Sequence, residues 1–190
     1  GYLPCPDDDY PPDGSPDSCS AFAIGRLPWE FIGLDEIRDS AGEPLWYLMA
    51  DDFKNIGSGR YYPINSETPA DTDLIVDTTT EVIAVIIAPG FSFAGQNRPS
   101  ANVGDYLEGD NSNNDASFVT QAIGEFNDQL LTITRQELMQ AIEKRVLGEV
   151  AKINRRYATV YDDNGLSFPY LSSFRNPRLS NSISDENVTL

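Results

Sequence analysis

The longest apolar run in the chain covers residues 82–88, where seven consecutive side chains are hydrophobic. A short run that is apolar at every position is typical of a strand covered on both faces, so we expect a central strand here. Glu81 and Pro89 flank the run, in positions that discourage aggregation of such a strand. A β-branched segment at residues 74–76 precedes it across a polar turn, and the two segments together predict a β-hairpin.

Two other segments also have the composition of strands. Residues 45–50 are aromatic and apolar, and they follow turn residues that end at Pro44. Residues 129–134 alternate between polar and apolar side chains, which predicts an edge strand.

A helix is predicted to begin directly after this edge strand. Thr134 and Glu137 have the spacing of a capping box, in which each side chain satisfies a backbone N–H group of the other residue. Apolar side chains then recur with helical periodicity to about Tyr157, and they form one stripe: Leu138, Ile142, Val146, Val150 and Ile153. These segments predict an α+β fold, with an antiparallel β-sheet and a long amphipathic helix.

The charges of this helix differ in sign from those of the whole chain. The chain carries 13 Lys and Arg against 30 Asp and Glu, a net charge of −17. The helix has six cations and three acids, a net charge of +3. Two interpretations stay open: the cations complement the dipole at the C-terminal end of the helix, or they form a docking face for the acidic surface of a neighbouring subunit. The residues are Arg135, Lys144, Arg145, Lys152, Arg155 and Arg156 against Glu137, Glu143 and Glu149.

The domain organisation follows from these segments. We expect residues 1–128 to form a globular domain with a closed N-terminal loop. Residues 129–175 would add the strand and the capped helix, packed on the same domain. Residues 176–190 are rich in Ser and Asn and predict a loosely ordered tail.

Composition excludes several classes of function. A charge of −17 repels phosphate backbones and anionic membranes, so we expect no nucleic-acid partner. The chain has no histidine, which removes His-based catalytic triads and the commonest zinc ligand. Ser92 follows the central strand, but the spacing G-x-S-x-x-G departs from a nucleophile elbow. We assign no catalytic residue and expect no enzyme, although a hydrolase built on paired carboxylates stays open as an alternative.

The two cysteines, Cys5 and Cys19, lie in a segment crowded with Pro and Asp. Such a segment cannot build a core of its own, so a disulfide is favoured over two buried free thiols. It would close a loop of about 15 residues, worth about 3 kcal/mol. Disulfides persist outside the reducing cytosol, which predicts a periplasmic, cell-surface or secreted protein.

The same segment contains candidate ligands for calcium, which binds six to eight oxygen atoms. Pro11 and Pro12 interrupt the spacing, and no bidentate Glu closes the loop, so a solvated acidic loop is the alternative. The candidate ligands are Asp7, Asp9, Asp13 and Asp17. We expect no other cofactor.

Three motifs resemble a known family. Residues 1–7 (GYLPCPD) resemble the G-x-L-P-C-P-D signature that follows the N-terminal helix in bacterial type IV pilin-like proteins, which carry a prepilin-type cleavage and methylation segment. Residues 25–29 (GRLPW) are similar to the next block of that group. Residues 39–47 (DSAGEPLWY) are similar to the D-x-W-G-x-P-L-x-Y turn of pseudopilins, with Ala41 in place of Trp. The resemblance implies a structural role for Pro4, Pro6, Gly25, Arg26, Leu27, Pro28, Trp29, Asp39, Gly42, Pro44 and Tyr47.

The resemblance also implies a function. It suggests a structural or assembly subunit of a type IV pilus-like or type II secretion-like filament, which contacts other pilin-like subunits or secretion-apparatus proteins. Such a subunit is anchored in the inner membrane by an apolar N-terminal helix before it enters the filament, in the periplasm or at the cell surface. The chain begins with Gly and has no apolar span, so we expect it to be the remainder of a longer precursor. The alternative function is a secreted calcium-dependent adhesin or carbohydrate-binding module.

Overall fold

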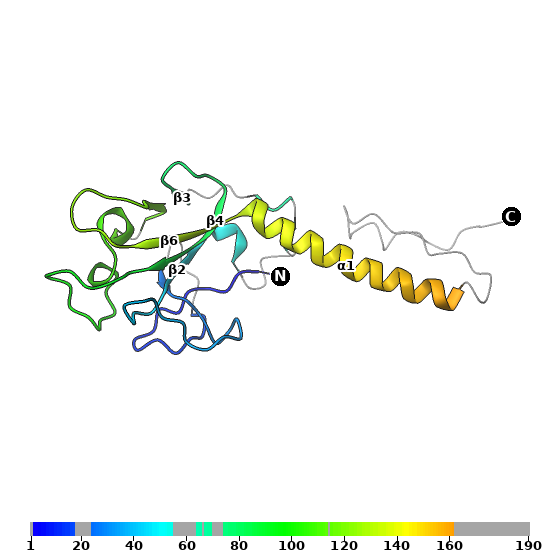
Figure 1. Ribbon diagram of the computed structural model, residues 1–190, viewed down its shortest axis with the longest axis horizontal. Coiled ribbons are helices and arrows are strands. Elements are labelled where there is room, and N and C mark those ends of the chain that lie inside the picture. Colours follow the sequence, from blue (N-terminus) through cyan, green and yellow to red (C-terminus); the bar gives the residue numbers. More distant parts are fainter. Residues whose placement is uncertain are drawn as a thin grey trace. The chain divides into compact units, whose positions relative to one another are not determined.

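The computed structural model describes residues 2–17, 24–54, 64–65, 67–69, 74–113 and 115–161, without the side chains of residues 156–161. The chain divides into two compact units, Gly1–Glu143 and Lys144–Leu190. The fold is α+β, as the sequence predicts: a four-stranded antiparallel sheet, one long helix and a small parallel sheet (Figure 1).

The larger sheet forms the centre of the first unit. Its strands are β1 (Gly25–Arg26), β2 (Trp46–Met49), β4 (Val82–Ala88) and β6 (Gln129–Thr134), in the order β1-β2-β4-β6. All neighbouring strands are antiparallel, with Tyr47 opposite Ile86 and Ile86 opposite Leu131. The predicted central strand is therefore confirmed as β4, and the predicted edge strand as β6.

The predicted hairpin between residues 74–76 and 82–88 is wrong. Strand β3 (Ile75–Val76) pairs in parallel with β5 (Ser117–Phe118), while both edges of β4 are occupied by β2 and β6. The side chain of Asp77 directs β3 to this second partner, because its carboxylate accepts hydrogen bonds from the backbone N–H and the hydroxyl of Thr120 at 3.0 and 2.6 Å.

The core lies on both faces of the larger sheet, because side chains alternate between the faces along each strand. Trp46 and Leu48 belong to one buried cluster, together with Val85, Ile87 and the aromatic ring of Tyr106. Tyr47 and Met49 belong to a second cluster on the other face, which contains Cys5, Leu27 and Ala84. The described residues of this unit also contain three short 3-10 helices: η1 (Asp51–Phe53), η3 (Val103–Asp105) and η4 (Gly109–Ser112).

Helix α1 (Arg135–Tyr161) begins directly after the last residue of β6, without an intervening loop. The predicted capping box is confirmed: Thr134 N donates to Glu137 Oε2 at 2.8 Å, and Glu137 N donates to Thr134 Oγ1 at 3.3 Å. Met139 is buried in the core, and Leu138 and Ile142 pack against it. Among the described residues, no helix is long and apolar enough to cross a membrane.

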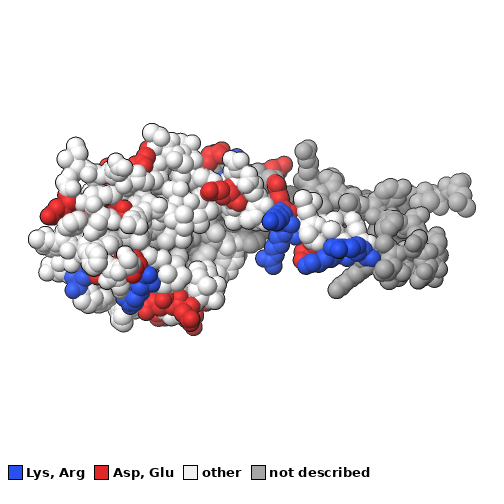
Figure 2. Space-filling model, in the orientation of Figure 1, with Lys and Arg blue, Asp and Glu red and all other residues white. Residues whose placement is uncertain are grey.

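The second unit is described only from residue 144 to residue 161, all of it within α1. The apolar stripe of the helix continues here into solvent, since Val146, Leu147 and Ile153 are 44, 68 and 51% exposed. Lys and Arg side chains gather along this part of α1 on the face shown in Figure 2. The predicted tail at residues 176–190 lies outside the described residues.

Candidate functional site

The acidic N-terminal loop, residues 7–17, is attached to the larger sheet through Asp7. Its backbone pairs with that of Arg26, with N···O distances of 3.0 and 2.6 Å. Its carboxylate, fully buried, accepts hydrogen bonds from Gly14 N at 2.6 Å and Asp9 N at 3.2 Å. Burial raises the pKa of Asp7. Asp7 therefore organises the loop from inside.

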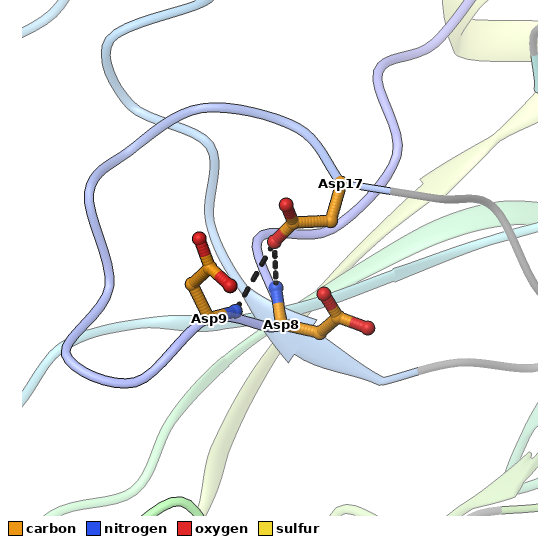
Figure 3. Close-up of side chains that lie close together, drawn as sticks. All are labelled: Asp8, Asp9 and Asp17. Carbon is orange, nitrogen blue, oxygen red and sulfur yellow. Dashed lines mark hydrogen bonds between the residues drawn. The ribbon is translucent and has the colours of Figure 1, made fainter.

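The far side of this loop brings three other carboxylates together. Oxygen atoms of Asp8, Asp9 and Asp17 all lie within 4.8 Å of one another (Figure 3). The loop is held closed because Asp17 Oδ2 accepts from the backbone N–H groups of Asp8 at 2.7 Å and Asp9 at 3.1 Å. The hydrogen bond with the Asp17 side chain is the main cause of a raised pKa for Asp8.

Three oxygen ligands at this spacing fit part of the coordination shell of a hard cation such as calcium. Of the four predicted ligands, Asp9 and Asp17 belong to the cluster, while Asp7 is used within the loop. Asp13 accepts a hydrogen bond from Ser15 N at 2.8 Å and stands outside the cluster. Asp8 was not among the candidate ligands predicted from the sequence. Its position between the two predicted ligands Asp7 and Asp9 was a signal that could have indicated it. Calcium binding stays a prediction.

A tight contact fixes the turn at the end of this loop. Gly14 has a φ of +84°, and a Cβ atom there would lie 2.4 Å from the Trp29 ring. Only glycine combines this backbone conformation with so close an approach. Gly25 is similarly confined, since its Cβ would lie 2.5 Å from the carbonyl oxygen of Asp7. These contacts give Gly25 and Trp29 a structural role in holding the loop against the sheet.

A small pocket of about 70 Å³, partly open to solvent, lies between the acidic loop and the sheet. It is lined by Asp7, Asp8, Asp9, Ile24, Gly25, Arg26, Trp46 and Ala101. The pocket is therefore lined by acidic side chains from the loop, by the buried cation of Arg26 and by the buried aromatic ring of Trp46.

That cation is the side chain of Arg26, which is only 5% exposed. Its guanidinium carbon lies 3.4 Å from the ring centroid of Trp46 and 4.5 Å from that of Tyr106. Arg26 Nη2 donates to the carbonyl oxygen of Ser100 at 3.1 Å, whereas Nε is buried without a hydrogen-bond partner among the described residues. Burial is the main cause of a lowered pKa for Arg26. The two rings take the place of water around the charge.

A second acidic pair is buried elsewhere in the first unit, at Glu108 and Asp128. Asp128 Oδ2 accepts from Glu108 N at 3.0 Å and from Asn111 Nδ2 at 2.9 Å. Both oxygen atoms of Glu108 also accept, from Gln96 Nε2 at 2.9 Å and from Asn127 N at 3.1 Å. Asp128 Oδ1 alone lacks a donor among the described residues. Burial, and after it the neighbouring Glu108, raise the pKa of Asp128 to about 7, so Asp128 holds its proton at a lower pH than this. No sequence pattern indicated this pair.

The turn at residues 39–44 is organised by the carboxylate of Asp39. Its Oδ1 accepts from Ala41 N and Glu43 N at 2.8 and 2.9 Å, and its Oδ2 accepts from Gly90 N at 2.8 Å, just beyond β4. Gly42 has a φ of +84°, and the segment that follows enters β2. Of the other residues to which the resemblance implies a structural role, Leu27, Pro6, Pro28 and Tyr47 are buried, and Pro4 and Pro44 are half-buried.

Cys5 is disulfide-bonded and buried beside Leu27 and Tyr47. The sequence has one other cysteine, Cys19, which lies outside the described residues.

An exposed apolar segment follows the buried Pro28. Within residues 30–37, here called the apolar loop, Phe31, Ile32, Leu34 and Ile37 are 50, 44, 48 and 39% exposed. The same loop carries Glu30, Asp35 and Glu36. A concentration of exposed apolar side chains with charged neighbours is typical of a protein interaction site.

No protein-family model, curated protein or solved structure matches this chain.

Proposed function

We propose that this chain is the globular part of a pilin-like or pseudopilin-like assembly subunit, which works through protein–protein contacts in a filament or secretion apparatus. The observation that carries the proposal is the apolar loop. Four large apolar side chains are exposed within seven residues, directly after the buried Leu27–Pro28 segment that anchors them. A partner surface would remove these side chains from water.

The arrangement of the three motifs supports the same function. Asp7 of the 1–7 motif pairs with Arg26 of β1, the 25–29 motif contains β1, and the 39–47 motif leads into β2. The motifs thus form one side of a single antiparallel sheet, which suits a rigid subunit that holds a docking surface in place. The disulfide at Cys5 supports an exported location.

The native gene tests this proposal. We expect the reading frame upstream of Gly1 to encode a short basic leader, a Gly and an apolar segment of about 20 residues. We also expect cells to yield the protein in a sheared filament fraction or bound to a secretion apparatus. An ordinary cleaved signal peptide, together with free monomer in the medium, would contradict the proposal.

The second candidate is a secreted calcium-dependent adhesin or carbohydrate-binding module. The cluster of Asp8, Asp9 and Asp17 favours it, because it lies beside a pocket that also contains Trp46. Calorimetric titration with calcium, followed by a panel of glycans, tests it. No heat of binding for either would remove this candidate.

A further inference from the structure

The exposed half of α1 carries a surface with two components. Val146 and Ile153 continue the apolar stripe that the first turns of the helix bury, and they are 44 and 51% exposed. Arg145 and Lys152 lie seven residues apart, and so on one side of this stripe. By sequence, five of the thirteen Lys and Arg of the chain lie within residues 144–156. Among the described residues, Arg145 and Lys144 form no ion pair, while Lys152 pairs with Glu149 at 2.6 Å on the exposed surface of the helix.

The apolar loop offers the matching components. It has large exposed apolar side chains, and its acids are Glu30, Asp35 and Glu36. Glu36 forms an ion pair with Arg38, and Glu30 accepts a weak hydrogen bond from the Ser15 hydroxyl at 3.4 Å. Asp35 has no such contact recorded within the described part of the chain. Charge and apolar character are therefore complementary between this loop and the second half of α1.

We propose that the apolar loop of one copy binds the 144–155 segment of α1 in a second copy, which deepens the proposed assembly function and rests on it. A second copy suits these surfaces because the cations of the helix meet the acids of the loop across the contact, although the net charge of −17 on each copy opposes association at long range. The contact joins two different patches, so a pair of copies retains one free helix on the first copy and one free loop on the second. Repetition of such a contact produces an open chain of subunits or a closed ring.

The contact is small, and its strength follows from its size. The 144–155 segment of α1 is about 18 Å long at 1.5 Å per residue. A helix of this length against one loop falls at the lower end of specific interfaces, so we expect weak binding in dilute solution. Two surface charge pairs add to the binding free energy, and salt weakens this contribution because it screens the attraction between the charges.

The test measures self-association of the whole 190-residue chain by sedimentation and light scattering over a range of concentrations. We expect the average mass of the wild type to rise with concentration and to fall when salt is raised from about 50 to about 300 mM. The helix variant R145E/K152E and the loop variant E30K/D35K should each associate about tenfold more weakly or worse. A mixture of the two variants should recover association, because the charges are then opposite again.

The matched control for the loop variant is D110K/E125K, which makes the same change of charge at two exposed acids outside the loop. We expect its association constant to stay within about twofold of the wild type. A second control, F91S/I123S, removes two exposed apolar side chains elsewhere and should also leave association intact, whereas F31S/L34S should abolish it.

Several results would overturn the contact. A wild type that stays monomeric to about 0.5 mM at low salt would do so, because repeated assembly needs binding in this range. A charge-swapped mixture no stronger than its components would also do so. A last experiment compares the binding of the wild type and of the helix variant to phosphatidylserine vesicles. If the wild type does not self-associate but binds lipid through Arg145 and Lys152, the helix binds a membrane surface instead.

The outcome separates this contact from the proposed function. Self-association that neither variant weakens would refute the contact and leave the assembly role in place. Charge-swap rescue, combined with an ordinary signal peptide in the native gene, would establish the contact and refute the pilin-like role.

Discussion

Replacement of Asp128 by Asn should make the protein more stable at alkaline pH. Asp128 and Glu108 are both buried, and three of their four carboxylate oxygens already accept hydrogen bonds. Only Oδ1 of Asp128 lacks a donor among the described residues. The amide of Asn can place its NH₂ group at this position, and it then resembles the protonated carboxyl without titrating.

The magnitude follows from the pKa of Asp128, which is raised from its ordinary 3.8 to about 7, first by burial. A raised pKa means that the folded state holds a proton which the unfolded state has lost. The stabilising proton is fully bound below about pH 4, and its contribution disappears as the pH rises through 7. At 1.36 kcal/mol per pKa unit, this loss reaches at most about 4 kcal/mol, because Glu108 shares the titration.

The assay is urea unfolding, followed by the fluorescence of the buried Trp46, between about pH 5 and pH 8. We expect the free energy of unfolding of D128N to exceed that of the wild type by about 1.5 kcal/mol near pH 5 and by up to about 4 kcal/mol near pH 8. Glu108→Gln is the counterpart, and it should destabilise at every pH because it places an NH₂ group against a donor. If the difference in free energy of unfolding between wild type and D128N is constant over this pH range, the pKa of Asp128 is not raised in the folded state and the prediction is refuted.

Three further predictions concern other parts of the structure. Arg26→Lys keeps the charge but loses the planar stack on Trp46 and Tyr106, so we expect a loss of about 2 kcal/mol in the free energy of unfolding, against less than about 0.5 kcal/mol for the exposed Arg38→Lys. Thr134→Ala removes the side-chain cap of α1 and should cost about 1 kcal/mol, measured by urea unfolding with circular dichroism; an unchanged midpoint would show that the cap contributes nothing. The melting temperature of the wild type should be higher in calcium than in chelator, whereas that of Asp17→Asn should be the same in both buffers. The control Asp110→Asn should show the same rise as the wild type. If the wild type melts at one temperature in both buffers, the loop binds no calcium and is a solvated acidic loop.

The sequence was sufficient to predict those elements whose pattern of apolar and polar side chains indicates directly which faces are buried. An all-apolar run gave β4 its central place, alternation gave β6 its edge place, and the spacing of Thr134 and Glu137 marked the start of α1. Each of these signals is local, because the partner atoms lie within a few residues or because burial on two faces requires apolar side chains at every position.

The pairing of β3 and the buried site residues could not be predicted in the same way. The partner strand of β3 lies about forty residues away in the sequence. The pairing of β3 with β5 is supported by the two hydrogen bonds that Thr120 donates to the Asp77 carboxylate. Arg26 and Asp128 look like ordinary charged residues in the sequence. Their burial comes from segments distant along the chain: the rings of Trp46 and Tyr106 for Arg26, and the Glu108–Asn111 segment for Asp128.

The direct junction between β6 and α1 has a mechanical consequence. Thr134 ends the strand and Arg135 begins the helix, so no slack chain separates them. Tension applied to α1 would reach the backbone hydrogen bonds between β6 and β4 at once, and from there the middle of the sheet. A subunit under load would yield at this strand pair, which a pulling experiment on single molecules would register as one abrupt extension.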